Sequence, residues 1–114
     1  MAEKTLKKEL VLQNKYGLHV RPAGLFAKIA SRFNADVEVE KDGNVVSGKS
    51  IMALMTLEAV CGTKLVVTAS GPQAAEVLEE LEALVESLGE MEVYVEGTTL
   101  YINTILVNGN EVEY

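Results

Sequence analysis

The residues best suited to chemistry gather in one short stretch, residues 17–24 (GLHVRPAG). It contains the only histidine, His19, and one of two arginines, Arg21. Pro22 suits the first turn of a helix, because the N–H that proline lacks would have no helical acceptor there. His19 is therefore predicted at or just before a helix N-terminus, where backbone N–H groups and the helix dipole favour an anion. Because imidazole is nucleophilic at neutral pH and Arg21 adds a permanent charge, the stretch is suited to carrying a phosphoryl group. A surface or capping histidine is the alternative that these residues alone leave open.

Length and composition limit the class of protein. At 114 residues, of which 48% are hydrophobic, the chain is predicted to form one domain with a single core. No apolar run approaches the roughly 18–20 residues that span a bilayer, so we expect no membrane insertion. The first nine residues alternate charge without an apolar segment, which argues against a secretory signal.

Cysteine and histidine are too scarce for several kinds of site. Cys61 is the only cysteine, which excludes an internal disulfide and fits a reducing cytosol. We therefore expect a cytoplasmic protein. A structural zinc site needs more Cys and His ligands than the chain has, and no metal or cofactor is expected.

The net charge of −7 hides a division along the chain. All ten Lys and Arg residues lie at or before Lys64, together with seven acidic residues, whereas ten Glu and no basic residue follow. No dense basic stripe or aromatic stacking surface accompanies the basic half, which argues against a nucleic-acid partner. The division permits an acidic protein partner that docks on the N-terminal half.

Hydrophobic periodicity predicts an α+β fold. Strands are predicted at residues 5–12, 36–41, 45–47 and 64–70, and helices at residues 20–33, 51–58 and 73–88. The order β-α-β-β-α-β-α indicates helices on one face of a largely antiparallel sheet. Lys8 does not fit the inward face of the first strand. Gly24 costs the first helix about 1 kcal/mol relative to Ala unless a close backbone approach requires it. The last helix is predicted to present a solvated acidic face rather than a metal site: Glu76, Glu79, Glu80, Glu82 and Glu86.

A second candidate stretch begins at Ser50, which is placed as the N-cap of the short helix over residues 51–58. Ile51, Met52 and Met55 share one side of this helix. Periodicity leaves two interpretations of these three residues open. They are part of the core, or they form an exposed and adaptable apolar patch for partners.

The two stretches lie about thirty residues apart. At this separation, they closely resemble two motifs of the HPr family, the histidine-containing phosphocarriers of the bacterial sugar phosphotransferase system. Residues 17–23 (GLHVRPA) are similar to the family's phosphorylation site, and residues 49–55 (KSIMALM) to its regulatory serine and docking helix. The resemblance covers residues 5–89. Val20 departs from the Ala that many members have beside the histidine. Residues 90–114 lie beyond the usual end of the family.

The resemblance implies an open-faced β-sandwich, with a four-stranded antiparallel sheet covered by three helices. It also implies phosphoryl transfer from phosphoenolpyruvate, through enzyme I, to Nδ1 of His19 and onward to sugar-permease phosphoacceptor domains. Arg21 would stabilise the phosphate, and an HPr kinase/phosphorylase would modify Ser50. The implied partner-binding residues are Lys28, Lys49, Ile51, Met52 and Met55. Such a protein is a carrier with no turnover of its own, not an enzyme.

Three other functions are weighed against this one. A protein of the same fold can act mainly as a regulator through phosphorylation of Ser50. A carrier devoted to nitrogen regulation is a second alternative, against which the intact stretch 49–52 argues. A true enzyme with His19 as general base and Arg21 as anion clamp is a third. No second acid, base or nucleophile accompanies these two residues, which argues against it.

The C-terminal residues carry their own prediction. We divide the chain into a phosphocarrier-like domain (1–89) and a β-prone extension (90–114). Strand patterns are predicted at residues 91–96, 100–107 and 111–114, with a break at 97–99 and a turn at Asn108-Gly109. An isolated hairpin is marginal in water, so the extension must pack on something. We favour a homodimer through these strands. Packing on the sheet face or edge of its own domain, and a frayed appendage, are the alternatives.

Overall fold

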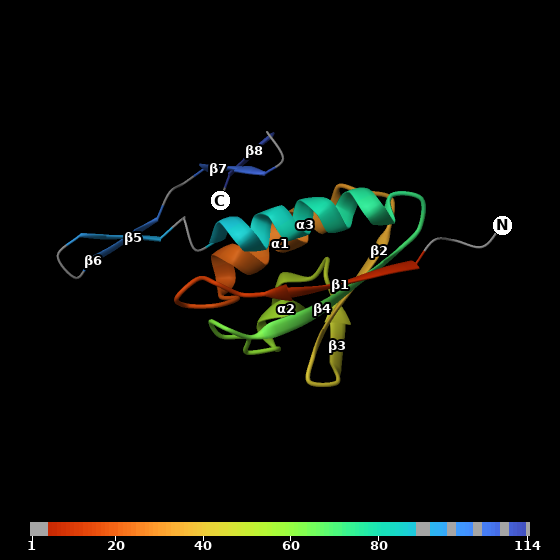
Figure 1. The fold of residues 1–114 in the computed structure, drawn as a ribbon, viewed down its shortest axis with the longest axis horizontal. Coiled ribbons are helices and arrows are strands. Elements are labelled where there is room, and N and C mark those ends of the chain that lie inside the picture. The colour runs from red at the N-terminus through yellow and green to blue at the C-terminus, as the bar shows by residue number, and fades with distance from the viewer. Residues whose placement is uncertain (1–4, 89–91, 96–97, 102–103, 108–109, 114) are drawn as a thin grey trace.

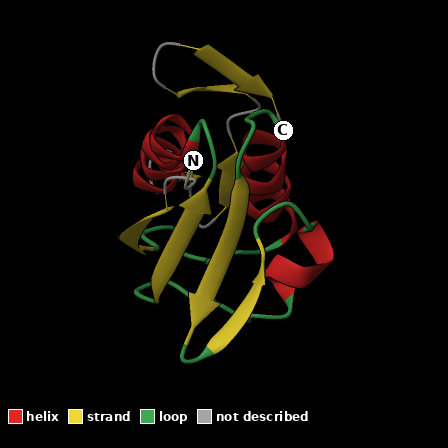
Figure 2. Ribbon diagram, turned by 90° about the vertical axis from the view of Figure 1, so that its right-hand side faces the viewer, coloured by secondary structure: helices red, strands yellow, loops and turns green. Residues whose placement is uncertain are grey.

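Within residues 5–88, four antiparallel strands form one sheet, and three helices form a layer that packs against it (Figures 1 and 2). The computed structural model describes residues 5–88 in full and the backbone of residues 92–95, 98–101, 104–107 and 110–113. The elements of this part are β1 (Thr5–Val11), α1 (Val20–Ser31), β2 (Asp36–Lys41), β3 (Asn44–Ser47), α2 (Ile51–Met55), β4 (Lys64–Ser70) and α3 (Ala74–Leu88). The predicted α+β order is confirmed.

The sheet has the strand order β1-β4-β2-β3, with every neighbouring pair antiparallel. Helices α1 and α3 lie side by side over one of its faces, while α2 packs against α1 and β3 (Figure 2). No helix of residues 5–88 covers the opposite face of the sheet. The structure is therefore the open-faced β-sandwich that the motifs imply.

The core lies between the sheet and the helices because each element buries one face. Strict alternation in β2 turns Val37 and Val39 inward, and Leu65 and Val67 of β4 do the same. On α1, Phe26 and Ile29 lie in the helical stripe that meets them. The hairpin between β2 and β3 turns at Asp42 and Gly43, which both have positive φ, as a two-residue type I′ loop requires.

Lys8 faces inward among apolar neighbours and is nevertheless stabilised. Its Nζ lies 2.8 Å from Oε1 of Glu82 on α3, and both side chains are about one-third exposed. The aliphatic stem covers the edge of the core while the ammonium group reaches a carboxylate at the rim. Lys8, which did not fit the inward face of the first strand, thus forms an ion pair between the sheet and the helix layer.

Five predicted element bounds differ from the structure within residues 5–88. Strand β1 ends at Val11 rather than at residue 12, and β3 begins at Asn44 rather than at residue 45. The other three are helix ends. Helix α1 ends at Ser31 rather than at residue 33, and the N–H of Arg32 donates to the carbonyl of Ile29. Helix α2 ends at Met55, because residues 56–58 follow as tight turns that finish with Glu58 at a φ of 50°. Helix α3 begins at Ala74, one residue later than predicted. Helix ends of this kind are set by turn geometry more than by hydrophobic periodicity.

The predicted solvated face of α3 is wrong at one position. Glu80 is only 8% exposed, so its carboxylate lies within the packed flank of the helix. Helical geometry places residue 80 beside Leu84 at the border of the apolar stripe. The remaining acidic residues of this face are exposed or half-exposed.

The described backbone beyond residue 88 forms two hairpins. Strand β5 (Glu92–Val95) pairs with β6 (Thr98–Tyr101), and β7 (Thr104–Val107) pairs with β8 (Asn110–Glu113), all antiparallel. The extension is β-structured as predicted, but the single run expected over 100–107 is divided between β6 and β7. The expected break at 97–99 is wrong for Thr98 and Thr99, which lie in β6. The predicted turn at Asn108-Gly109 and the helix stop at Gly89 lie outside the described residues.

Strand β7 packs against α3 (Figure 1). The predicted alternative of packing within the chain therefore applies to this strand, but on the helix layer rather than on the sheet face or edge. Helix α3 is the last element before the extension, so its surface lies within reach of the strands that follow. Among the described residues, no helix is both long and apolar enough to span a membrane.

Candidate functional site

His19 is the N-cap residue of α1, as predicted. Its backbone is extended, with φ −85° and ψ −170°, and its carbonyl accepts the N–H of Ala23 at 2.9 Å, the first bond of the helix. The residue is half-exposed, but its Nε2 atom is buried. Nε2 is therefore the ring nitrogen that a reaction partner cannot reach in this arrangement.

Arg21 and Pro22 are the second and third residues of α1. Arg21 is exposed and Pro22 is buried. Proline contributes no N–H to a turn whose N–H groups have no acceptor within the helix. The structure therefore places a nucleophilic ring, the positive end of a helix and a guanidinium within three consecutive positions, an arrangement that favours a phosphoryl dianion.

A tight turn over residues 14–17 holds the segment before His19. The N–H of Gly17 donates to the carbonyl of Asn14 at 3.2 Å, and Nδ2 of the buried Asn14 donates to the carbonyl of Gly17 at 2.6 Å. Gly17 has a φ of 64°, and a Cβ there would lie 2.2 Å from the carbonyl oxygen of Ala59. The N–H of Leu18 donates to that same oxygen at 2.8 Å.

The sequence-based prediction does not include these contacts of residues 14–18, which support His19. The 59–63 loop closes on the strand end as well, since the N–H of Leu12 donates to Thr63 and the N–H of Gly62 donates back to Leu12. An Asn followed three residues later by Gly is a turn signal that could have indicated the local part. The contact with Ala59 joins positions about forty residues apart and has no local signal.

At the tip of the turn, Tyr16 lies beside the histidine and Lys15 lies over the ring of Tyr16. The rings of Tyr16 and His19 have centroids 6.1 Å apart and planes at 82°, an edge-to-face arrangement. Nζ of Lys15 lies 5.4 Å from the centroid of the Tyr16 ring, within the range of a cation–π contact. Neither residue was among the predicted site residues.

Ser50 is the N-cap of α2, as predicted. Its Oγ accepts the N–H of Ala53 at 3.1 Å, and its backbone is extended. Lys49 is exposed, and its N–H donates to Oγ of Ser47 at 3.2 Å. Because an N-cap hydroxyl satisfies a helix N–H, the position serves local structure whatever else acts on it.

The structure decides between the two interpretations of the α2 side chains. Met52 is 80% exposed, Ile51 is 42% exposed and Met55 is 41% exposed, whereas Leu54 is fully buried. The three residues therefore form an apolar surface, here called the α2 patch, and not a part of the core. It adjoins α1, since Cδ1 of Ile51 lies 3.9 Å from where a Cβ of Gly24 would be. Lys28, also exposed, is one turn further along α1.

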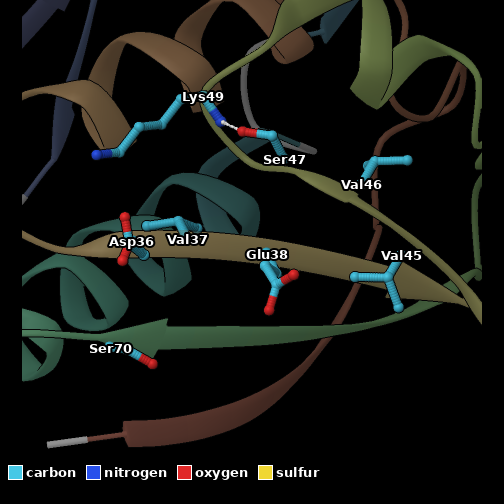
Figure 3. Close-up of a pocket in the computed structure, with 8 residues that line it drawn as sticks. All are labelled: Asp36, Val37, Glu38, Val45, Val46, Ser47, Lys49 and Ser70. Carbon is cyan, nitrogen blue, oxygen red and sulfur yellow. Dashed lines mark hydrogen bonds between the residues drawn. The ribbon is translucent and has the colours of Figure 1, made fainter. Parts of the chain in front are cut away.

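Metal-binding side chains and surface hollows could also form part of a site. Within the described part of the chain, no group of His, Cys, Asp and Glu side chains could hold a metal ion. A hollow of about 480 Å³ opens beside β2 and β3 (Figure 3), and neither His19 nor Arg21 lines it. Its walls are Asp36, Val37, Glu38, Val45, Val46, Ser47, Lys49 and Ser70.

Comparison with known proteins agrees with the fold. Residues 6–87 match the family described as the PTS HPr component phosphorylation site. The chain is 42% identical over 85 residues to phosphocarrier protein HPr of Borreliella burgdorferi, which covers 75% of this chain and 99% of that protein. The crystal structure of HPr-C-His from Thermoanaerobacter tengcongensis superposes with a TM-score of 0.73 at 38% identity, covering 77% of this chain and 99% of that one.

A regulatory relative is similar as well. The crystal structure of Crh, a catabolite repression protein of Bacillus subtilis, is described as a dimer with a swapped domain. It matches with a TM-score of 0.60 at 42% identity, covering 73% of this chain and 95% of that one.

The fold and the family match over residues 6–87 define a phosphocarrier domain of the open-faced β-sandwich class. The chain belongs to the HPr family of the phosphotransferase system. Residues 88–114 lie beyond the range that the family match covers.

Proposed function

We propose that this chain accepts a phosphoryl group on Nδ1 of His19 from phosphorylated enzyme I and passes it to sugar-permease phosphoacceptor domains. The observation that carries the proposal is the position of His19 as the N-cap of α1, with Nε2 buried. Nδ1 attacks phosphorus with its lone pair, and a P–N bond forms as the bond to the donor breaks. The buried Nε2 keeps the ring proton.

The site suits a carrier because it stabilises the phosphoryl group without trapping it. Helix N–H groups together with one arginine are worth about 1–3 kcal/mol to the charged state. A phosphohistidine stabilised by this amount remains a good donor for the next protein. The chain accordingly has no turnover of its own.

Intact mass spectrometry tests the assignment. With enzyme I and phosphoenolpyruvate, the wild-type chain should gain one phosphoryl group, and His19→Ala should gain none. Arg21→Ala should stay folded and accept the group about one to two orders of magnitude more slowly, as expected for loss of a charge-assisted contact. Arg32→Ala, at the other end of the same helix, is the matched control and should react at the wild-type rate. Phosphorylated His19→Ala would refute the assignment.

The α2 patch, with Lys28 and Lys49, is the surface that we propose for partners. Its exposed Ile51, Met52 and Met55 suit docking by several proteins in turn, because methionine adapts to different surfaces. The basic residues beside it would attract acidic partners such as we expect enzyme I to be. The partners are expected in the cytoplasm.

A regulatory role through Ser50 is the second candidate. The likeness to Crh and the placement of Ser50 beside the α2 patch favour it. In this role an HPr kinase/phosphorylase modifies Ser50, and the modified face recruits or excludes partners. Phosphorylation at Ser50 by such a kinase, with no uptake from enzyme I, would replace the carrier proposal by this one.

Self-association through the extension is a further part of the proposal. The dimer described for Crh involves a swapped domain, and the hairpins β5–β6 and β7–β8 each have two strands. Two-stranded units present open edges to which another chain can add. We therefore propose that the extension joins two copies and leaves His19 available on each.

A further inference from the structure

The ring of Tyr16 contacts the ring of His19. Tyr16 is 48% exposed, so burial in the core does not account for its position. Its centroid lies 6.1 Å from that of His19, with the two planes at 82°. Edge-to-face pairs of this kind favour one relative orientation over others, because the edge of one ring meets the electron-rich face of the other.

The backbone holds Tyr16 in this place. It is the third residue of the turn over residues 14–17, which is closed by the backbone N–H of Gly17 and by the side chain of Asn14. The positive φ of Gly17 and the bond from Leu18 to Ala59 then fix where the turn meets α1. Tyr16 therefore reaches His19 from a rigid support and not from a long flexible loop.

Lys15 restrains the ring from another side. Its Nζ lies 5.4 Å from the centroid of Tyr16, so a cation and an imidazole both contact the same aromatic ring. The two contacts together limit how far the Tyr16 ring can rotate away from His19.

We propose that Tyr16 is a positioning residue that holds the imidazole of His19 in its transfer orientation and shields the phosphorylated ring from water. The inference rests on the proposed carrier function of His19. Hydrolysis is the reaction that the shield opposes. In it water attacks phosphorus, the P–N bond breaks, the ring nitrogen takes one proton from that water and inorganic phosphate leaves. A second ring packed beside the imidazole removes part of the space from which water can approach the phosphorylated ring.

The matched variants are Tyr16→Phe, which keeps the ring, and Tyr16→Leu, which keeps only apolar bulk. The full chain is phosphorylated with phosphoramidate, a small donor that needs no enzyme I, and loss of the phosphohistidine signal is followed by ³¹P NMR. Tyr16→Phe should keep the wild-type lifetime. Tyr16→Leu should shorten it about five- to tenfold, as loss of an aromatic contact of this kind permits.

A second measurement separates this inference from the proposed function. In the unphosphorylated protein, the ring-proton NMR signals of His19 should shift in Tyr16→Leu and stay unchanged in Tyr16→Phe, because only the first variant removes the ring. Unchanged His19 signals and an unchanged phosphohistidine lifetime in Tyr16→Leu would overturn the inference. Failure of the wild-type chain to react with enzyme I would count against the carrier function. The Tyr16 test would still be decided, because phosphoramidate supplies the phosphoryl group.

Discussion

Gly17 and Ala59 are in backbone contact, so that a Cβ on Gly17 would lie 2.2 Å from the carbonyl oxygen of Ala59 and 2.7 Å from Cα of Val60. The same carbonyl accepts the N–H of Leu18. The segment that presents His19 is therefore packed directly on the loop before β4, and no side chain fits between them.

Gly17→Ala should destabilise the domain and also impair the site. The substitution forces a methyl group against backbone and strains a φ of 64°, so we expect a loss of about 2 kcal/mol or more in the free energy of unfolding. Thermal denaturation should show a melting temperature lower by roughly 8 °C or more.

Gly62→Ala is the control for this experiment. Gly62 also has a positive φ, of 89°, but no atom of the described residues lies within 4 Å of where its Cβ would be. It should lose about 1 kcal/mol from backbone strain alone. Equal losses in the two variants would contradict the importance of the contact with Ala59.

Gly24→Ala should stabilise the protein. The Cβ would meet only Cδ1 of Ile51, at 3.9 Å, an ordinary van der Waals distance. In the part of the chain that the structure describes, no backbone from another element approaches closely enough to require a glycine here. Ala in a helix interior is favoured over Gly by about 0.5–1 kcal/mol, which denaturant titration can measure.

Gly48→Ala provides the opposite case. Its Cβ would lie 2.5 Å from Cγ1 of Val37 and 3.2 Å from Cε1 of Phe26, both in the core. We expect this variant to lose about 1–3 kcal/mol through overpacking. A stabilised Gly48→Ala, or a destabilised Gly24→Ala, would show that the packing around α1 and β3 differs from this structure.

The sequence predicts much of the fold because the signals for it are local. Alternation in β2 and helical periodicity in α1 and α3 need no knowledge of distant residues, and the N-caps at His19 and Ser50 depend on the next few positions. These features are confirmed.

What the sequence could not predict depends on contacts between distant residues. Lys8 pairs with Glu82, which lies 74 positions further along the chain. No pattern within β1 indicates that partner. The burial of Glu80 likewise depends on what packs beside α3. At the site, His19 and Arg21 are indicated by type and spacing, whereas the support from Asn14 and Ala59 and the contact with Tyr16 need the tertiary fold.

Ser50→Asp should slow phosphorylation of His19 while preserving stability. Asp is as good an N-cap as Ser, and a negative charge at a helix N-terminus is favourable. The same charge beside the α2 patch should repel acidic groups of enzyme I. The rate of phosphoryl uptake and the melting temperature are measured together.

Ser50→Ala is the companion variant, because it loses the bond from Ala53 without adding charge. It should lose about 1 kcal/mol of stability but keep its rate of uptake. A marked fall in the melting temperature of Ser50→Asp would contradict the role of Oγ as the cap acceptor.

Removal of residues 90–114 should leave a folded domain with an active His19. The buried core is built from Leu10 to Leu88, and the family match ends at residue 87. Strand β7 contacts α3, so truncation uncovers part of that helix and should cost some stability without unfolding the domain.

If the extension joins two copies, light scattering should give a dimer mass for the full chain and a monomer mass for the truncated one. Phosphoryl uptake per chain should be the same in both. Identical monomer masses would exclude self-association through the extension and leave its packing on α3 as its structural role.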